Sequence, residues 1–110
     1  MGYDLHATRA EHWTSSAGLE IPETQWHAVI STDPELRSDG ENGPNAVVWL
    51  DAAGGERGWF DWYAGAIYTT NPDQARVGKL LEIAERLGAR VQGDRGEFYE
   101  TAEDWQEEVS

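Results

Sequence analysis

Residues 71–88 carry the feature that most limits the fold, an amphipathic helix with signals at both ends. Asn71 suits the N-cap, Pro72 suits the first helical position, and Gly88 suits a left-handed C-cap. The apolar side chains that recur every three or four residues are Val77, Leu80, Leu81, Ala84 and Leu87. The opposite face is charged, so the sequence predicts a helix that packs one side on a sheet.

The chain on both sides of this helix has the patterns of β-strands. Residues 3–8 alternate apolar and polar side chains, as is typical of a strand with one buried face. Three β-branched and aromatic runs predict an antiparallel meander over residues 46–50, 58–63 and 66–70. Residues 90–92 and 97–99 flank a Gly-Asp-Arg-Gly turn and predict a hairpin.

A shorter helix is predicted between the first strand and the meander. Its apolar residues at helical spacing are Trp26, Val29 and Ile30. Pro22 suits the first turn, and the Asp-Pro pair at residues 33–34 stops the helix near Thr32. Residues 37–45 are rich in Ser, Asp, Gly, Asn and Pro, and we expect a loop there.

Together these elements predict an α+β fold. We expect a single domain over residues 1–101, in which a mainly antiparallel sheet of five to six strands carries two helices on one face. A chain of 110 residues is long enough for one core, and the absence of cysteine means that packing must stabilise it. Residues 102–110 are expected to form an acidic C-terminal tail.

The charge of the chain excludes several classes of partner. With 21 acidic and 8 basic residues, the net charge is −13. Such a chain repels phosphate backbones and anionic lipids, so direct binding to nucleic acid or membrane is not expected. The longest apolar run is far shorter than the roughly 20 residues that span a bilayer, and no signal peptide opens the chain. We therefore expect a cytoplasmic protein.

Three segments resemble a family of small, mostly uncharacterised bacterial proteins. They are residues 1–9 with Gly-Tyr-Asp-Leu-His at 2–6, residues 21–36 with Trp26, and residues 71–94, which end in Gln-Gly-Asp. The resemblance spans most of the chain, although the central loop is shorter here. It implies no catalytic residues. The compact, acidic character of the chain is also similar in type to that of bacterial immunity proteins.

Aromatic side chains are concentrated in the run at residues 58–63. In a strand, Trp59 and Tyr63 would share one face, whereas Phe60 and Trp62 would share the other. One set is expected to face the helices. The other set lies either in a second small cluster under a loop or in solvent, where Trp and Tyr are typical anchors of a binding surface.

The C-terminal part of the chain is strongly acidic, with no Lys or Arg after Arg95. Such a run is often only a solvated surface, but it can also steer a basic partner into contact. The partner-binding residues that we predict are Trp59, Asp61, Trp62, Tyr63, Glu97, Glu100, Glu103, Asp104 and Trp105.

Signals for catalysis or metal binding are few. Asp4 and His6 share a face of the first strand, and an Asp–His pair can orient a general base or bind a metal if further partners are present. The chain has no HExxH, GxGxxG or Walker motif and no thiolate ligand. We therefore expect no catalytic residues, no metal and no cofactor.

The favoured hypothesis is a cytoplasmic acidic binding protein that neutralises a basic protein partner. Its most specific form is an immunity protein that blocks an antibacterial toxin domain. Two alternatives stay open: a small enzyme that uses Asp4 and His6, and a module that binds sugars or other small ligands through Trp59 or Trp62.

Overall fold

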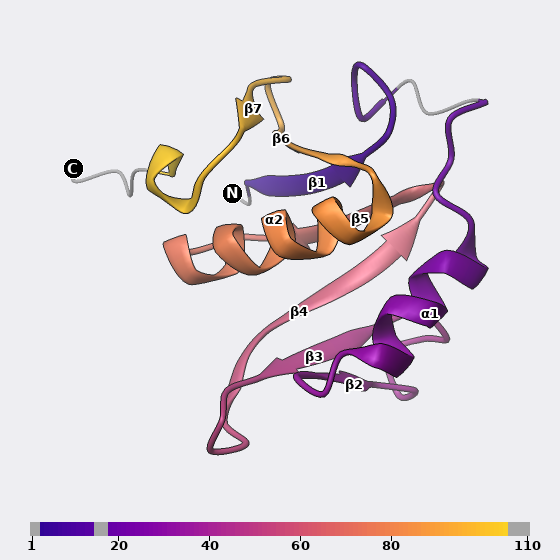
Figure 1. Ribbon diagram of the computed structural model, residues 1–110, viewed down its shortest axis with the longest axis vertical. Helices are drawn as coiled ribbons and strands as arrows, with labels where there is room; N and C mark the ends of the chain where they lie inside the picture. Colours follow the sequence, from indigo (N-terminus) through magenta and orange to yellow (C-terminus); the bar gives the residue numbers. More distant parts are fainter. Residues whose placement is uncertain (1–2, 15–17, 106–110) are drawn as a thin grey trace.

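The computed structural model describes residues 3–14 and 18–105 and contains, within them, a seven-stranded antiparallel sheet and two α-helices (Figure 1). The strands are β1 (Asp4–Thr8), β2 (Leu36–Ser38), β3 (Val47–Leu50), β4 (Glu56–Tyr63), β5 (Ala66–Thr70), β6 (Arg90–Gly93) and β7 (Phe98–Tyr99). The helices are α1 (Glu23–Thr32), α2 (Gln74–Leu87) and the short 3-10 helix η1 (Ala102–Asp104). The predicted α+β class is confirmed, because both α-helices lie on one face of an antiparallel sheet.

The strand order is β2-β3-β4-β5-β1-β6-β7, which places β1 inside the sheet. His6 of β1 lies opposite Tyr68 of β5 and opposite Gln92 of β6. Asp61 of β4 lies opposite Tyr68 from the other side. Leu5, the neighbour of His6 on β1, belongs to the core beneath the helices. His6 and its cross-strand neighbours therefore lie on the opposite, helix-free face of the sheet.

The predicted meander and the predicted C-terminal hairpin are both confirmed. β3, β4 and β5 are consecutive neighbours, and β6 pairs with β7. Ala64 and Gly65 turn the chain between β4 and β5 with φ values of 52° and 87°, the left-handed conformation that a two-residue hairpin turn requires. Tyr63 then lies opposite Ala66, and this register decides which face each β4 side chain occupies.

The segment predicted as a loop over residues 37–45 begins with part of a strand. Leu36–Ser38 pairs antiparallel with β3 at the edge of the sheet, where Leu36 is buried. β2 is only three residues long, and both Arg37 and Ser38 are exposed. It is therefore too short to show an alternating pattern in the sequence. The sheet therefore has more strands than the five to six predicted.

Helix α2 begins after Asp73, so the predicted N-cap Asn71 and the proline after it both precede the helix. The Asp73 carboxylate accepts a hydrogen bond of 2.8 Å from the Arg76 amide. Asn71 instead has a φ of 47°, and its side-chain oxygen accepts a hydrogen bond from the Tyr3 amide. At the other end, Gly88 is the predicted left-handed C-cap, with a φ of 63°.

Replacing Asp73 by alanine is expected to lower the free energy of unfolding by about 1 kcal/mol, because the Arg76 amide then loses its acceptor. Asp73→Asn keeps a side-chain oxygen at the cap and is expected to cost only part of this. Urea denaturation of the two variants measures the difference. Equal losses in both variants would contradict the assignment of the cap.

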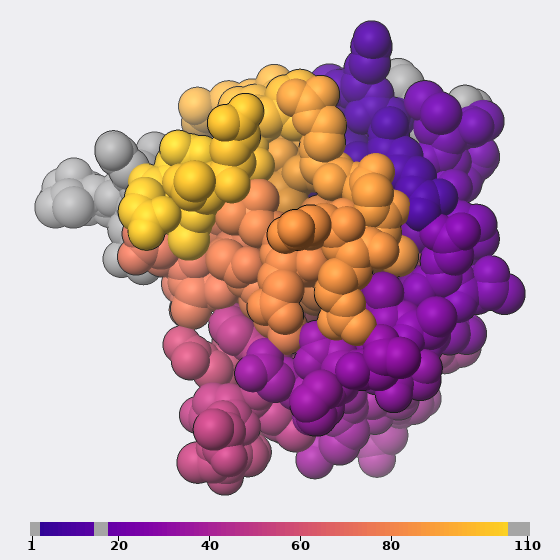
Figure 2. All heavy atoms as spheres, in the orientation of Figure 1, coloured from indigo at the N-terminus to yellow at the C-terminus, as the bar shows by residue number. Residues whose placement is uncertain are grey.

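The core fills the space between the sheet and the two helices. β1, β4 and β5 contribute Leu5, Phe60 and Ile67, all fully buried. Trp26 of α1 is also fully buried, and its indole N–H donates a hydrogen bond of 2.8 Å to the Asn45 carbonyl. Helix α2 contributes Val77, Leu80, Ile83, Ala84 and Leu87. Figure 2 shows this side, with α2 (orange) between the C-terminal segment (yellow) and α1 (purple).

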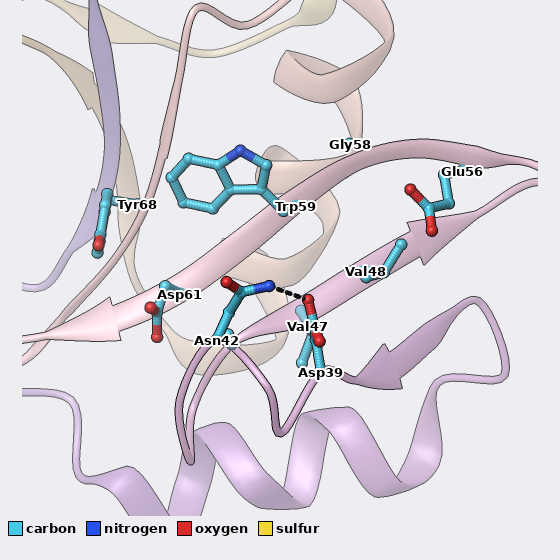
Figure 3. Close-up of a pocket in the computed structure, with 10 residues that line it drawn as sticks. Asp39, Asn42, Val47, Val48, Glu56, Gly58, Trp59, Asp61 and Tyr68 are labelled. Atoms are coloured by element: carbon cyan, nitrogen blue, oxygen red, sulfur yellow. Dashed lines mark hydrogen bonds between the residues drawn. The ribbon is translucent and has the colours of Figure 1, made fainter.

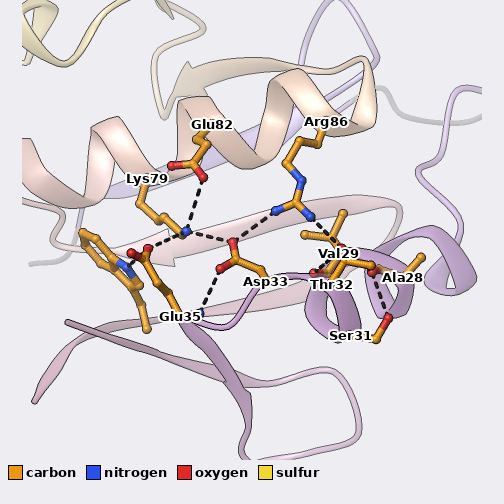
Figure 4. A network of polar contacts seen from close by, with 10 residues as sticks. Ala28, Val29, Ser31, Thr32, Asp33, Glu35, Lys79, Glu82 and Arg86 are labelled. Atoms are coloured by element: carbon orange, nitrogen blue, oxygen red, sulfur yellow. Dashed lines mark hydrogen bonds and ion pairs between the residues drawn. The ribbon is translucent and has the colours of Figure 1, made fainter. Parts of the chain in front are cut away.

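An ion cluster built around the buried side chains of Lys79 and Asp33 joins α2 to the segment that follows α1 (Figure 4). The side chain of Lys79 is 2% exposed, and its Nζ lies 2.8 Å from Asp33 Oδ2 and 2.8 Å from Glu35 Oε1. Arg86 Nη1 lies 3.1 Å from the same oxygen of Asp33, and the Trp49 indole donates to Glu35. These contacts fix α2 against the connection between α1 and β2.

The C-terminal segment is described as far as Trp105. Thr101 and Asp104 form a capping box at η1, which packs against α2. Trp105 is half-buried, with its ring centroid 5.5 Å from that of Tyr3 and 6.1 Å from that of Tyr99. Residues 106–110 of the predicted acidic tail lie outside the described residues. Within residues 3–14 and 18–105, no helix has both the length and the hydrophobicity needed to cross a bilayer.

Candidate functional site

Successive side chains of β4 lie on opposite faces of the sheet, and the structure shows which of the two sets is exposed. Phe60 is fully buried beneath the helices. Trp62, on the same face, is half-buried, and its indole N–H donates a hydrogen bond of 2.7 Å to the Ile21 carbonyl. Trp59 and Tyr63 lie on the helix-free face, where they are 37% and 75% exposed. The helix-free face is therefore the exposed aromatic surface.

A pocket of about 440 Å³ opens beside Trp59 on this face (Figure 3). β4 supplies Trp59 and Asp61, β5 supplies Tyr68, and the loop between β2 and β3 supplies Asp39 and Asn42. Trp59 meets Tyr68 edge to face, with centroids 5.6 Å apart and rings at 85°. The Asn42 side-chain amide donates a hydrogen bond of 2.6 Å to Asp39. The pocket thus has aromatic walls and three carboxylates, because Glu56 at the start of β4 lines it together with Asp39 and Asp61.

Carboxylates give this face a negative potential. Burial raises the pKa of Tyr68, and the charges of Asp61 on β4 and Asp4 on β1 raise it further from either side. In the part of the chain that the structure describes, no Lys or Arg nitrogen lies within 4.0 Å of a carboxylate oxygen of Asp39 or Asp61. Glu56, which also lines the pocket, lies 3.9 Å from Arg37, so the carboxylates that no described cation neutralises are Asp39 and Asp61.

A second pocket, of about 570 Å³, continues along the same face. Its lining includes Asp4, His6, Trp13, Tyr63 and Tyr68. Trp13, from the loop after β1, stacks on the imidazole of His6 with centroids 4.0 Å apart and an interplanar angle of 5°. The two pockets share Tyr68 as a wall, and we refer to both together as the acidic aromatic groove.

Asp94 forms a polar cluster with Asp4 and His6, which line the second pocket. His6 is 6% exposed, and its Nε2 lies 3.1 Å from Asp94 Oδ1. The other oxygen, Asp94 Oδ2, accepts a hydrogen bond of 2.8 Å from the Asp4 amide. Asp4 and His6 share a face, as the strand pattern predicted. A third side chain, Asp94 from the turn after β6, lies next to them.

The predicted C-terminal site residues lie elsewhere on the molecule. They are Glu97, Glu100, Glu103, Asp104 and Trp105, and none of them lines either pocket of the groove. Glu100 and Glu103 are exposed. Asp104 accepts hydrogen bonds from the amides of Glu100 and Thr101, and these bonds hold the pKa of its carboxyl below the usual value. Of the predicted set, the structure brings Trp59, Asp61 and Tyr63 together and separates them from the C-terminal acids.

Several residues of the groove were not among those predicted. Asp39 and Asn42 come from a loop whose position the sequence does not reveal. Tyr68 lies in a strand that was predicted, and the structure shows it to be half-buried between buried Ile67 and Thr69.

Comparison with known proteins finds no matching protein-family model, curated protein or solved structure. The geometry of the site is therefore the basis for assigning a function. That geometry is an α+β domain whose helix-free sheet face carries the acidic aromatic groove.

Proposed function

We propose that this protein binds a basic protein partner in the acidic aromatic groove and neutralises it, in the manner of an immunity protein that blocks a toxin. One observation carries the proposal: the indole of Trp59 lines the same pocket as Asp39 and Asp61, and no described cation pairs with either carboxylate. A cationic side chain from a partner would supply the missing charge.

Arginine is the side chain that suits this pocket best. Its planar guanidinium can stack on an indole, a contact worth about 0.5–1 kcal/mol when exposed and about 2 kcal/mol when desolvated. The same group donates charge-assisted hydrogen bonds to carboxylates such as Asp61 in a fixed fork geometry. Lysine offers only a compact, strongly hydrated charge, so we expect arginine to bind more tightly.

The net charge of −13 supports a strongly basic partner. Exposed carboxylates outside the groove, including Glu100 and Glu103, add to the long-range field that speeds the approach of such a protein. A toxin that acts on nucleic acid has a suitable surface, because phosphate backbones are bound through Lys and Arg. An acidic protein bound to that surface would exclude the substrate.

Titration with a capped Gly-Arg-Gly peptide tests the pocket, with the isosteric Gly-citrulline-Gly peptide as the neutral control. In two-dimensional amide NMR spectra at low salt, we expect saturable shifts at the Trp59 indole and at the amides of Asp61 and Tyr68. The citrulline peptide is expected to cause none. Shifts spread evenly over the acidic surface, including Glu100, would contradict a specific arginine pocket.

Neutralisation is tested by a matched pair of baits, the wild-type chain and the variant Asp39→Asn/Trp59→Ala/Asp61→Asn. A basic protein from the source organism that binds the wild type with 1:1 stoichiometry, and not the variant, is expected at low salt. Co-expression with the wild type, and not with the variant, should then relieve its toxicity. Equal retention by both baits, or relief by both, would contradict the role of the groove.

The exposed C-terminal acids are expected to act on association alone. Glu100→Lys/Glu103→Lys should slow binding of that partner and flatten its salt dependence, with little change in the dissociation rate. Asp104 is left intact because its carboxylate holds two backbone amides. Stopped-flow measurements at several salt concentrations separate the two rates. Unchanged association would remove these residues from the mechanism.

A further inference from the structure

Asp4, His6 and Asp94 form a cluster of metal-ligating side chains on the helix-free face. Each offers one ligand atom, and the three atoms lie within 4.8 Å of one another. Asp4 and His6 are two residues apart on β1, so both point to the same side, and Asp94 follows β6, the neighbouring strand. β1 and the turn that follows its neighbour β6 therefore hold the three side chains.

We propose that these three side chains bind one divalent transition-metal ion, with Zn²⁺ as the best match. One imidazole nitrogen and two carboxylate oxygens suit Zn²⁺, whereas Mg²⁺ prefers oxygen ligands alone. Tetrahedral Zn²⁺ has bonds of about 2.0–2.2 Å, which places its ligand atoms roughly 3.3 Å apart. The three ligand atoms already lie within 4.8 Å of one another, so a bound ion would draw them closer together.

The histidine is already held in a fixed orientation. His6 is buried and stacked on Trp13, and its Nε2 faces Asp94 at 3.1 Å. A metal ion bound by both atoms would replace this hydrogen bond. Asp94 keeps its second oxygen on the Asp4 amide, which is the kind of supporting hydrogen bond that orients a ligating carboxylate.

The surroundings leave the two carboxylates short of positive charge and leave space for further ligands. Among the residues described by the structure, no Lys or Arg nitrogen lies within 4.0 Å of an Asp4 or Asp94 carboxylate oxygen. Asp4 and His6 also line the second pocket of the groove, so water or a small anion can reach a bound ion from that side. A three-ligand site open to a pocket leaves the fourth position of Zn²⁺ free.

Calorimetric titration of the chelator-treated, desalted protein with ZnCl₂ tests the site, and CoCl₂ gives an independent absorption spectrum. We expect 1:1 binding, a rise in the melting temperature with Zn²⁺, and quenching of Trp13 fluorescence by Co²⁺. Asp4→Asn, His6→Asn and Asp94→Asn are each expected to weaken Zn²⁺ binding about tenfold or more. Asp4→Asn is the variant least at risk of misfolding, because no hydrogen bond of its side chain is described.

Three matched variants serve as controls. His12→Asn removes the nearest other imidazole, which also stacks on Trp13, and His27→Asn removes a distant one on α1. Asp61→Asn removes a carboxylate from the other pocket of the groove. All three are expected to bind Zn²⁺ like the wild type. Absence of 1:1 binding, or equal binding by wild type and Asp4→Asn, or loss in His12→Asn, would overturn the proposal. The measurement uses no protein partner, so its result is independent of the proposed function.

Discussion

Replacing Asp33 by alanine is expected to lower the free energy of unfolding by about 3–5 kcal/mol, because the buried ammonium of Lys79 loses its buried carboxylate partner and keeps the more exposed Glu35 and Glu82. Lys79 is 2% exposed and Asp33 is 5% exposed, and their charged atoms lie 2.8 Å apart. Arg86 loses its carboxylate partner in the same variant. Urea denaturation at neutral pH, followed by tryptophan fluorescence, measures the loss.

Two further variants separate burial of charge from loss of contacts. Lys79→Met in the Asp33→Ala background removes the buried positive charge and is expected to recover part of the stability. Arg37→Ala breaks an exposed ion pair with Glu56, at 3.9 Å, and is expected to change stability by less than about 0.5 kcal/mol. Similar losses in Asp33→Ala and Arg37→Ala would show that burial is not the cause.

The same cluster predicts a loss of stability in acid. Burial alone would raise the pKa of Asp33, but hydrogen bonds from Lys79 and from the Glu35 amide outweigh it, so the pKa lies below its ordinary 3.8. The hydrogen bond from Lys79 also lowers the pKa of Glu35 below 4.5. Because both values are lower in the folded chain than in the unfolded chain, the stabilisation is complete above about pH 5 and is lost as the pH falls through the folded-state values. We expect this loss to be smaller in Asp33→Ala.

Trp59→Ala is expected to weaken binding of the proposed basic partner about 30-fold or more, mainly through faster dissociation, as for a central aromatic anchor. Its ring forms one wall of the pocket and meets Tyr68 edge to face. Because Trp59 is 37% exposed, the variant should keep its fold. Surface plasmon resonance with the identified partner gives both rate constants.

Trp62→Phe is the matched control on the opposite face of the same strand. It removes the hydrogen bond to the Ile21 carbonyl and should reduce stability modestly, with no change in the dissociation rate of the complex. Tyr63→Ala, at the other end of the groove, should have a smaller effect than Trp59→Ala because Tyr63 is 75% exposed. A larger increase in the dissociation rate from Trp62→Phe than from Trp59→Ala would contradict binding of the partner at the helix-free face.

Most of the fold could be predicted from local patterns. The amphipathic period of α2, its C-cap at Gly88 and the aromatic runs of the meander each depend on neighbouring residues alone. The N-cap lies at Asp73, two residues after the predicted Asn71, and both residue types are good caps. The hydrogen bond between Asn71 and the Tyr3 amide, which is far away in sequence, decides between them. Strand β2 was missed because a three-residue edge strand has no period of its own.

The site could be predicted only in part. The alternation of β4 correctly grouped Trp59 with Tyr63 but could not say which face the helices cover. The contact between His6 and Asp94 depends on the strand order, and the presence of Asp39 in the Trp59 pocket depends on the position of a loop. Both involve residues that are far apart in sequence. The acidic C-terminal residues were predicted from a strong compositional signal, yet they lie away from the groove. Composition carries no information about the position of a residue in the fold.

The central position of β1 has a consequence for the order in which the chain folds. Its partners are β5 and β6, so its hydrogen bonds close loops of more than half the chain. During synthesis, the meander of β3, β4 and β5 can form while Leu5 and Ala7 still lack the helix that buries them. The middle of the sheet is completed only when β6 leaves the ribosome, and such distant pairing makes folding slow.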